Sequence, residues 1–476
     1  MFFNSITYFL FLSVLFLLYW FLLKTDFKKQ NLLLLVASYF FYSCWDYRFL
    51  FLLIFSTVLD YCTGIKIAEA EQKKSKRFWI FLSIGINVGI LAIFKYYDFF
   101  AQSFTDAMSV IGIQTHFVML NVILPVGISF YTFHGISYIV DIYNEKIAPE
   151  RNFINYSLFV SFFPLLVAGP IERATHLLPQ ITQSRTFSYS QAMNGMRQIV
   201  WGLFKKVVVA DNCAQYVDVV FPAYTEASTL QLITAVVLFS FQIYGDFSGY
   251  SDIALGSAKL FGFDLLRNFS YPYFSRDIAE FWRRWHISLT SWFRDYIYIP
   301  LGGSKMGVRY SIRNTLTVFV ISGFWHGANW TFIGWGMLHA VYFMPLLLSG
   351  KNRTHLEIVS QNHALPNFKE LFQILYTFSL VSFAWIFFRT PSVTDAIGYI
   401  KSIFQNQSAL PQLSATYSFI AVILMLLFEW HSRRFTIPFI SIQNRFIRMS
   451  SYAIVTLLIF FMGAFVNQRS FIYFQF

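Results

Sequence analysis

The segment SGFWHGANW, Ser322–Trp330, places a histidine inside a long apolar run. His326 lies within residues 315–343, which contain no Lys, Arg, Asp or Glu. An ionisable side chain at membrane depth is costly to bury and is retained where it has a function. A neutral imidazole can accept a proton from a hydroxyl, so His326 is predicted to be a catalytic general base. The alternative is a core histidine that hydrogen-bonds to a neighbouring helix.

The neighbours of His326 are predicted to line a cavity around it. If the run is one continuous helix, Ser322 and Asn329 share the face of His326 and can fix its tautomer. Trp325 precedes His326 directly and is assigned to the same cavity.

Two further features of the run have structural interpretations. Gly323 and Gly327 have the small-xxx-small spacing that lets another backbone approach closely. His339 is about 220° further around a helix than His326, so it faces elsewhere. We therefore predict that His339 is structural.

His286, in the segment FWRRWHISL, is the second catalytic candidate. Residues 271–313 mix arginine with tryptophan, and the segment 281–303 within them, which ends in Pro300, Gly302 and Gly303, is too polar to span a membrane. Irregular backbone at membrane depth must line a cavity or be buried in protein, so we expect a cytoplasmic interfacial or re-entrant segment. There His286 can meet His326 across a cavity, and two imidazoles in a dry pocket lower each other's pKa, which favours the neutral form that a general base needs. The alternative is an ordinary interfacial histidine.

Charged residues near these segments are predicted to support the site. Arg283, Arg284 and Arg294 are expected at the cytoplasmic mouth, where guanidinium groups can recruit a phosphate-bearing donor. Their alternative role is to anchor lipid headgroups. Asp246, in QIYGDFSGYSDIALG, is assigned to the cavity. Like other polar residues at the ends of apolar segments, it has the alternative role of capping a helix or forming an ion pair; the others include Asp252, Glu172, His134 and Asp141.

The composition is that of a membrane protein. The chain has 476 residues, of which 56% are hydrophobic and only 13% charged, against about 25% charged in soluble proteins. The first 23 residues are uncharged, and a helix of about 20 apolar residues spans a bilayer. Further apolar runs occur near 31–44, 49–66, 78–97, 117–140, 153–168, 228–245, 314–348, 371–389, 414–430 and 450–467. We therefore predict an all-α polytopic membrane protein with roughly 10 to 13 spans.

The distribution of Lys and Arg predicts an orientation. The net charge of +12 comes from short basic clusters between apolar runs, which favours membrane anchoring over nucleic-acid binding. Residues 69–77 and 304–313 are expected to be cytoplasmic, and residues 100–115 external.

Several chemistries lack their motifs in this sequence. The three cysteines are scattered without a zinc spacing, so no metal site is predicted. The P-loop, nucleophile-elbow and H-E-x-x-H motifs do not occur, which argues against ATP-driven pumping, an α/β-hydrolase and a zincin. A polysaccharide or lipid transporter is an alternative of another class, although we find no inverted-repeat halves.

The motifs FWRRWHISLTSWFRDYIYIPLGG and SGFWHGANWTFIGWGMLHA resemble the membrane-bound O-acyltransferase family, in its bacterial alginate O-acetyltransferase branch. LPVGISFYTFHGISYIVDIY, VAGPIER and YGDFSGYSDIA resemble the same branch, so the likeness extends from about residue 120 to 340. The resemblance implies one transmembrane acyltransferase domain over residues 1–476, with its motif-bearing core at about 120–345. It also implies a ring of tilted helices with re-entrant segments around a through-membrane cavity. His326 matches the family's intramembrane catalytic histidine, and His286 its upstream polar catalytic position.

The resemblance further implies an activity and its partners. We expect transfer of an acyl group, in the first place acetyl, from a cytoplasmic thioester to a hydroxyl of an extracytoplasmic polysaccharide such as alginate. The donor is expected to be acetyl-CoA or an acyl carrier protein, with no bound cofactor. Transfer is either direct or relayed by a periplasmic or membrane-anchored partner, and the expected location is the bacterial inner membrane. Alternative acceptors are peptidoglycan, cellulose and, for D-alanyl transfer, teichoic acid.

Overall fold

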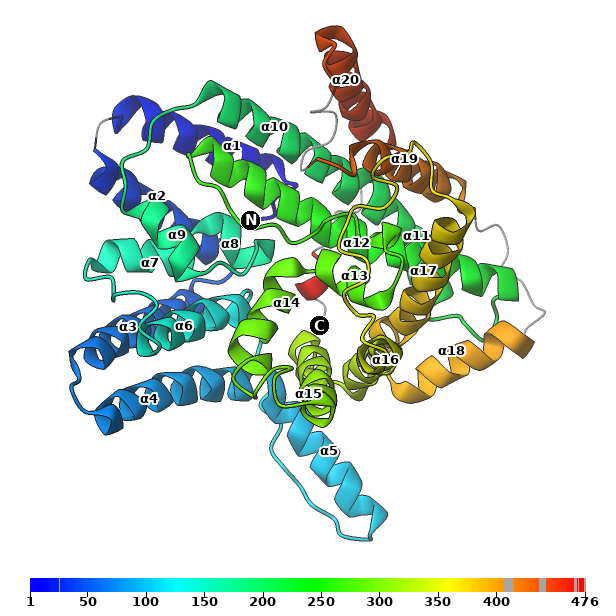
Figure 1. The fold of residues 1–476 in the computed structure, drawn as a ribbon, viewed down its shortest axis with the longest axis horizontal. Coiled ribbons are helices and arrows are strands. Elements are labelled where there is room, and N and C mark those ends of the chain that lie inside the picture. Colours follow the sequence, from blue (N-terminus) through cyan, green and yellow to red (C-terminus); the bar gives the residue numbers. More distant parts are fainter. Residues whose placement is uncertain (25, 406–413, 436–441, 466–468, 470, 475–476) are drawn as a thin grey trace. The chain divides into compact units, whose positions relative to one another are not determined.

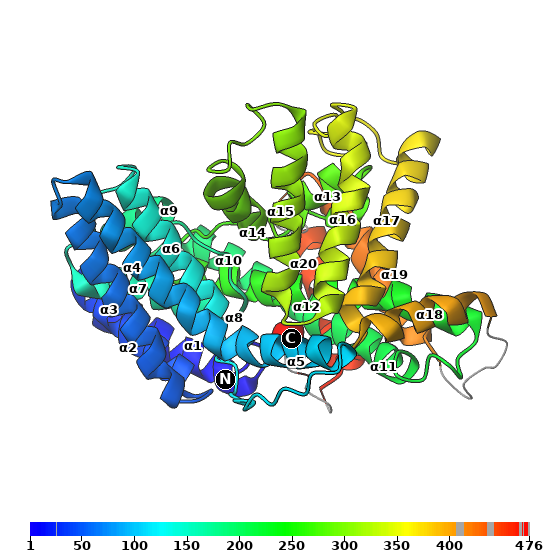
Figure 2. The same ribbon diagram turned by 90° about the horizontal axis from the view of Figure 1, so that it is seen from below.

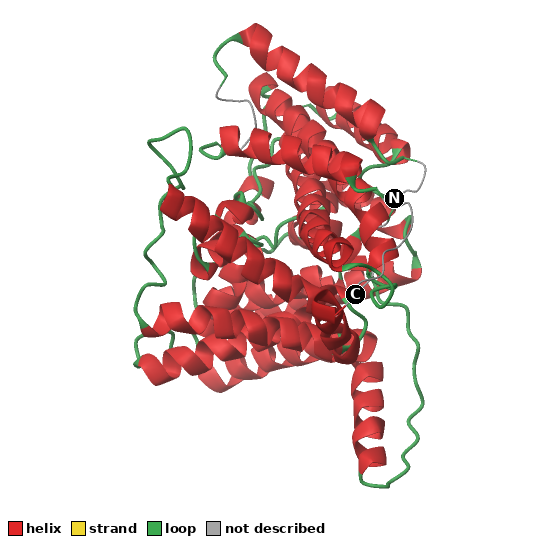
Figure 3. Cartoon of the chain, turned by 90° about the vertical axis from the view of Figure 1, so that its right-hand side faces the viewer, coloured by secondary structure: helices red, strands yellow, loops and turns green. Residues whose placement is uncertain are grey.

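The computed structural model describes residues 1–24, 26–405, 414–435, 442–465, 469 and 471–474. The described residues form helices and loops and contain no β-strand (Figures 1 and 3), which confirms the all-α prediction. The chain divides into two compact units. Unit 1 comprises Met1–Ala192 and Ser257–Leu266, and unit 2 comprises Met193–Gly256 and Arg267–Phe476.

Unit 1 is built mainly from the first nine helices. They are α1 (Ile6–Leu17, continued by a π-helical turn Leu18–Leu22), α2 (Phe27–Ser43), α3 (Arg48–Glu69), α4 (Lys73–Leu91, continued by a π-helical turn Ala92–Tyr96), α5 (Tyr97–Val110), α6 (Ile128–Tyr143), α7 (Phe153–Ser161), α8 (Phe163–Ala168) and α9 (Ala174–Ile181). Helix α3 packs against α4 and α6, and the three lie side by side in Figures 1 and 2. A Cβ on Gly135 of α6 would lie 1.9 Å from a carboxylate oxygen of Asp60 on α3, so glycine is required for this approach.

Unit 2 contains the remaining helices. They are α10 (Tyr189–Leu203), a π-helical segment Phe204–Ala210, α11 (Asp211–Val220), α12 (Thr229–Leu260), α13 (Ile278–Arg284), α14 (Ile287–Phe293, continued by a π-helical turn Arg294–Tyr298), α15 (Val308–His326), α16 (Trp330–Leu348), α17 (Phe368–Arg389), α18 (Val393–Gln405), α19 (Thr416–Ser432) and α20 (Arg445–Met462), with short 3-10 turns at Pro272–Phe274 and Ile472–Phe474. The first residues of α10 and the last residues of α12 belong to unit 1.

Helices α15, α16 and α17 pack in sequence order in unit 2 and lie side by side in Figure 2. Glycines bring α15 and α16 together. A Cβ on Gly323 would lie 2.3 Å from the carbonyl oxygen of Phe332, and one on Gly336 would lie 2.3 Å from that of Phe319. The close backbone approach predicted at Gly323 is thus confirmed, and its partner is the next helix along the chain.

Six helical segments among the described residues are long and apolar enough to cross a membrane. They are Arg48–Glu69, Lys73–Val110, Thr229–Leu260, Trp330–Leu348, Phe368–Arg389 and Arg445–Met462, and two shorter apolar segments are Ile6–Leu22 and Thr416–Ser432. They fit the polytopic membrane architecture expected from hydropathy. Fewer segments meet these limits than the apolar runs suggest because several runs form shorter helices: 31–44 lies largely in α2, which has 17 residues, and 153–168 is divided into α7 and α8.

Two predicted runs differ from the helices in extent. The run near 117–140 is helical only from Ile128, because residues 113–125 form an extended segment that returns from α5 (Figure 3). Helix α20 covers most of the run near 450–467, and residues 466 and 467 lie outside the described part of the chain.

Candidate active site

His326 is the last residue of α15. The helix ends there because Gly327 is extended, with φ −164° and ψ 153°, and Asn329 begins the next helix as its N-cap. The Asn329 side chain accepts a hydrogen bond from the Thr331 N–H at 3.0 Å and donates one to the Pro391 carbonyl at 2.8 Å. The prediction that Asn329 shares a helical face with His326 is therefore wrong, since no single helix contains both residues. Asn329 instead lines an open cleft together with Arg389 and Pro391.

The imidazole of His326 is enclosed by aromatic rings. It is 3% exposed, and its ring centroid lies 4.9 Å from Trp325, 5.0 Å from Trp335, 5.3 Å from Phe388 and 5.5 Å from Tyr473. The predicted neighbour Trp325 is one of these rings. Ser322 is buried one turn earlier on α15.

His286 lies at the junction between α13 and α14, in a conformation that L-residues rarely adopt. Its φ and ψ are 42° and 55°, in the left-handed region, which costs a non-glycine residue about 1–2 kcal/mol. The side chain is completely buried, and its ring lies edge-on to Phe247 at 4.7 Å. Neither ring nitrogen has a hydrogen-bond partner among the described residues. The donor and acceptor capacity of this buried imidazole is therefore not used by the described residues.

The two histidines belong to one aromatic cluster. Trp325 contacts both rings, at 5.9 Å from His286 and 4.9 Å from His326. Phe247 and Tyr473 form a second link between the two histidines. The ring of Phe247 contacts His286 and lies 4.8 Å from the ring of Tyr473, which lies 5.5 Å from the ring of His326. We call the cluster of His286, His326, Phe247, Trp325 and Tyr473 the histidine chamber. The structure therefore brings together the two residues that the sequence selected from separate motifs.

The pKa of His286 is lowered, as expected. Burial among aromatic rings disfavours the charged imidazolium and lowers the pKa of His286. Of the two predicted influences, loss of solvent lowers this pKa, and the second imidazole does not contribute. The consequence for chemistry is the same, because His286 stays neutral and has one N–H donor and one acceptor nitrogen.

Asp246 joins an ion-pair network at the edge of the chamber. Its carboxylate lies 2.6 Å from Lys206 Nζ, which also lies 2.9 Å from Asp211. Its other oxygen accepts a hydrogen bond from the backbone N–H of Ile472 at 2.6 Å. Asp246 thereby fixes the segment that places Tyr473 beside His326. No signal in the sequence of this segment pointed to that position.

Asp252 lies in a second polar group on α12. Its carboxylate lies 2.5 Å from Lys205 Nζ, and Glu429 accepts a hydrogen bond from Tyr244 at 2.8 Å. These residues line a small internal cavity together with Asn268. The structure thus favours the ion-pair interpretation of Asp252.

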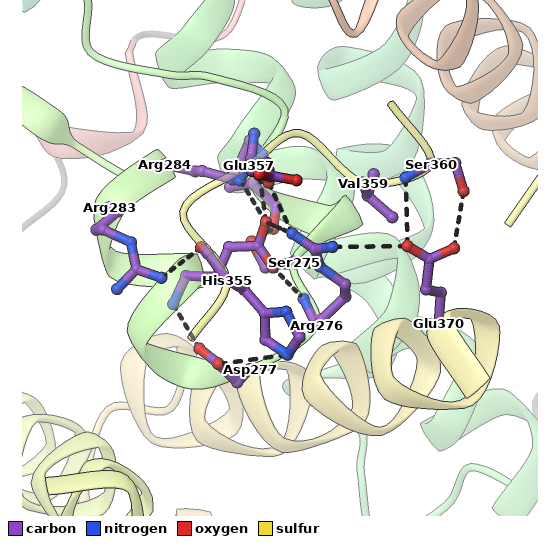
Figure 4. Close-up of polar contacts among 12 residues, drawn as sticks. Ser275, Arg276, Asp277, Arg283, Arg284, His355, Glu357, Val359, Ser360 and Glu370 are labelled. Carbon is purple, nitrogen blue, oxygen red and sulfur yellow. Dashed lines mark hydrogen bonds and ion pairs between the residues drawn. The ribbon is translucent and has the colours of Figure 1, made fainter. Parts of the chain in front are cut away.

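Two of the three arginines predicted to recruit a donor, Arg283 and Arg284, are bonded to other groups of the protein (Figure 4). Arg283 donates to the carbonyl oxygens of Asn352 and His355, at 2.8 and 2.7 Å. Arg284 donates to the buried Glu280 carboxylate at 2.8 Å. The two Arg283 bonds, and a longer one from Arg284 to the carbonyl oxygen of Glu357 at 3.3 Å, hold the polar loop at 351–363 onto α13. Arg294 differs, because its side chain is 62% exposed and pairs with the neighbouring Asp295.

His339 and the motif residues of unit 1 form hydrogen bonds to other groups of the protein. The ring of His339 is fully buried and accepts a hydrogen bond from Trp282 Nε1 at 3.3 Å. In unit 1, the buried Glu172 carboxylate binds the Leu266 N–H at 2.6 Å and the His176 ring at 2.8 Å. His134 Nε2 accepts the backbone N–H of Glu172 at 3.0 Å. These contacts tie the VAGPIER segment to its neighbours.

Comparisons with known proteins agree with these motifs. The family model described as MBOAT, membrane-bound O-acyltransferase family, matches residues 145–388. The peptidoglycan O-acetyltransferase of Helicobacter pylori is 37% identical over 425 residues, covering 83% of this chain and 78% of that protein. A probable alginate O-acetylase AlgI of Pseudomonas aeruginosa is 36% identical over 402 residues, covering 84% and 74%.

A more distant relative has a different acyl group in its name. The teichoic acid D-alanyltransferase of Bacillus subtilis is 29% identical over 238 residues, covering 48% of this chain and 60% of that protein. The family match covers half of this chain and includes both candidate histidines. The chain therefore belongs to the membrane-bound O-acyltransferase family and is a multi-pass membrane acyltransferase.

Proposed function

We propose that this enzyme transfers an acetyl group from a cytoplasmic thioester to a hydroxyl of an extracytoplasmic polysaccharide, with alginate as the first candidate acceptor. The enclosure of His286 and His326 in one aromatic chamber carries this proposal. A thioester needs protection from water, and the chamber's apolar walls provide it. A hydroxyl needs a base before it can attack, and a histidine is suited to that role.

In this proposal His326 is the general base. It takes the proton from the acceptor hydroxyl, whose oxygen attacks the thioester carbonyl, and the proton then passes to the departing thiolate. His286 is neutral and donates a hydrogen bond to the carbonyl oxygen as negative charge develops there. Its ring nitrogens, which have no partner among the described residues, are available for that contact.

The donor and partners follow from the same chemistry. A phosphopantetheine arm, on acetyl-CoA or on an acyl carrier protein, delivers a thioester through a narrow cavity across the membrane. We propose that the enzyme lies in the bacterial inner membrane and passes the acetyl group to the polymer directly or through a periplasmic or membrane-anchored partner protein. Arg294, with Arg283 and Arg284, is proposed to help recruit the donor phosphate.

Peptidoglycan is the second candidate acceptor. The relatives named for peptidoglycan and for alginate are similarly close, at 37% and 36% identity. The aligned part of the D-alanyltransferase is shorter and less similar, at 29%.

A deletion strain complemented with this gene tests the function and separates the two acceptors. Mild base releases acetate from O-acetyl esters, so the acetate on extracellular polysaccharide and on purified peptidoglycan is measured separately. Loss of polysaccharide esters on deletion, with recovery on complementation, supports the first candidate. Loss from peptidoglycan alone supports the second. Unchanged ester content in both polymers contradicts the proposed function.

A further inference from the structure

Asn268 lies on a loop that runs beside the residues around His286. The Ile287 N–H donates to the carbonyl oxygen of Asn268 at 2.9 Å, and the Ser270 N–H donates to that of Arg284 at 3.0 Å. The two bonds join the loop to residues on either side of His286. They therefore hold the backbone on both sides of His286, which has the left-handed conformation.

The side chain of Asn268 adds two hydrogen bonds to these backbone contacts. Its Oδ1 accepts a hydrogen bond from the Ser288 hydroxyl at 2.6 Å, and its Nδ2 donates to Ser251 at 3.1 Å. Asn268 and Ser288 are each 1% exposed, and Ser251 is 3% exposed. Asn268 thus connects α12, through Ser251, to the first turn of α14, through Ser288.

This arrangement accounts for the conformation of His286. A non-glycine residue stays in the left-handed region only where the surrounding structure holds it there. Asn268 supplies that restraint through one backbone and two side-chain contacts, all within unit 2. The imidazole that results lies against Phe247 and Trp325, and no described residue bonds its nitrogens. The restraint therefore directs a chemically available group into the histidine chamber.

We propose that Asn268 is a positioning residue for acyl transfer, which holds His286 in its left-handed conformation so that the imidazole faces the histidine chamber. The inference rests on the proposed catalytic role of His286. Asn268 itself touches no reacting atom and acts through the backbone of its neighbour.

A double-mutant cycle tests the proposal. Asn268→Ala, His286→Ala and the double variant are expressed as full-length chains in the deletion strain. The readout is the rate at which base-labile acetate accumulates on the polymer, normalised to the amount of protein in the membrane. Asn268→Ala is expected to lower the rate about 10- to 100-fold, because small displacements of a catalytic group have effects of that size. In the His286→Ala background, Asn268→Ala is expected to cause no further loss of rate, because both changes remove the same contribution of the His286 imidazole.

Two further variants separate positioning from general stability. Ser288→Ala removes the hydroxyl that donates to Asn268 Oδ1 and leaves the backbone bond between Ile287 and Asn268, so a smaller rate loss with normal membrane levels is expected. Ser382→Ala removes another buried hydroxyl, whose bond to Ser240 is 2.9 Å, and the normalised rate is expected to stay at the wild-type level. Thermal unfolding in detergent reports the stability of each variant.

The outcomes are distinct. A wild-type rate in Asn268→Ala, or equal fold losses in both backgrounds of the cycle, overturns the positioning role while leaving the function of His286 intact. A wild-type rate in His286→Ala contradicts the catalytic role proposed for His286, and the positioning inference falls with it.

Discussion

The carboxylate of Asp246 accepts a hydrogen bond from the backbone N–H of Ile472 at 2.6 Å, and thereby fixes the residue before Tyr473. The same carboxylate pairs with the buried Lys206. Asp246→Ala is expected to lower the free energy of unfolding by about 3 kcal/mol, because the buried Lys206 ammonium loses one of its two carboxylate partners. Transfer activity per folded molecule is expected to fall as well, since Tyr473 is released from its place beside His326.

Thermal unfolding and ester accumulation measure these two effects. Asp218→Asn is a suitable control, because Asp218 pairs with Arg389 and Arg469 but is 41% exposed. Asp218→Asn is expected to lower the free energy of unfolding by less than about 1 kcal/mol. Equal losses of stability and of activity in Asp246→Ala and Asp218→Asn contradict the role assigned to Asp246.

Replacing Arg283 and Arg284 together by Gln tests donor recruitment against loop anchoring. Recruitment predicts that the donor concentration needed for half-maximal rate rises while the maximal rate is largely kept. This pattern is expected when an interaction that is equally strong in the ground state and the transition state is lost. Loop anchoring predicts a lower unfolding temperature, because the carbonyl oxygens of Asn352 and His355 lose their donor. Arg294→Gln is the matched variant, because Arg294 is exposed and forms no part of the loop contacts. Unchanged donor dependence in both variants rejects recruitment by these arginines.

The positive-inside pattern predicts the orientation of unit 1 in the membrane. A cysteine at Ser109 is expected to react with an impermeant reagent from outside, whereas one at Ser75 is expected to be protected. Cys44 and Cys62 are exposed and must first be replaced by serine. The reverse labelling pattern inverts the proposed direction of transfer.

His176 predicts a pH dependence of stability in unit 1. Its hydrogen bond to Glu172 raises the pKa of His176 above the value of the unfolded chain. The stabilisation is therefore fully present below the unfolded pKa of about 6.5 and is lost as the pH rises through the higher folded pKa. We expect His176→Gln to lower the unfolding temperature more at about pH 5.5 than at about pH 8.5. An equal change at both pH values shows that the charged pair does not stabilise the fold.

The two histidines were selected from the sequence on different grounds, and their catalytic role stays a prediction. His326 stands out in a run without charges, and His286 in a segment too polar to span. Their surroundings were less predictable. The helix break at Gly327 depends on capping by Asn329, whose contacts include the distant Pro391. Asn268 and Tyr473 reach the chamber only through tertiary contacts, which periodicity along the chain does not encode.

The most direct test of the central claim is the transfer rate of His326→Ala compared with that of His339→Ala. Both histidines are buried, and both changes remove an imidazole that packs against Trp335. A general base contributes about 10² to 10⁴ in rate, so His326→Ala is expected to abolish measurable acetylation while the protein still inserts and folds. His339→Ala is expected to lower stability but to keep activity in the folded fraction. Full acetylation of the polymer by His326→Ala, at matched protein levels, would contradict the account.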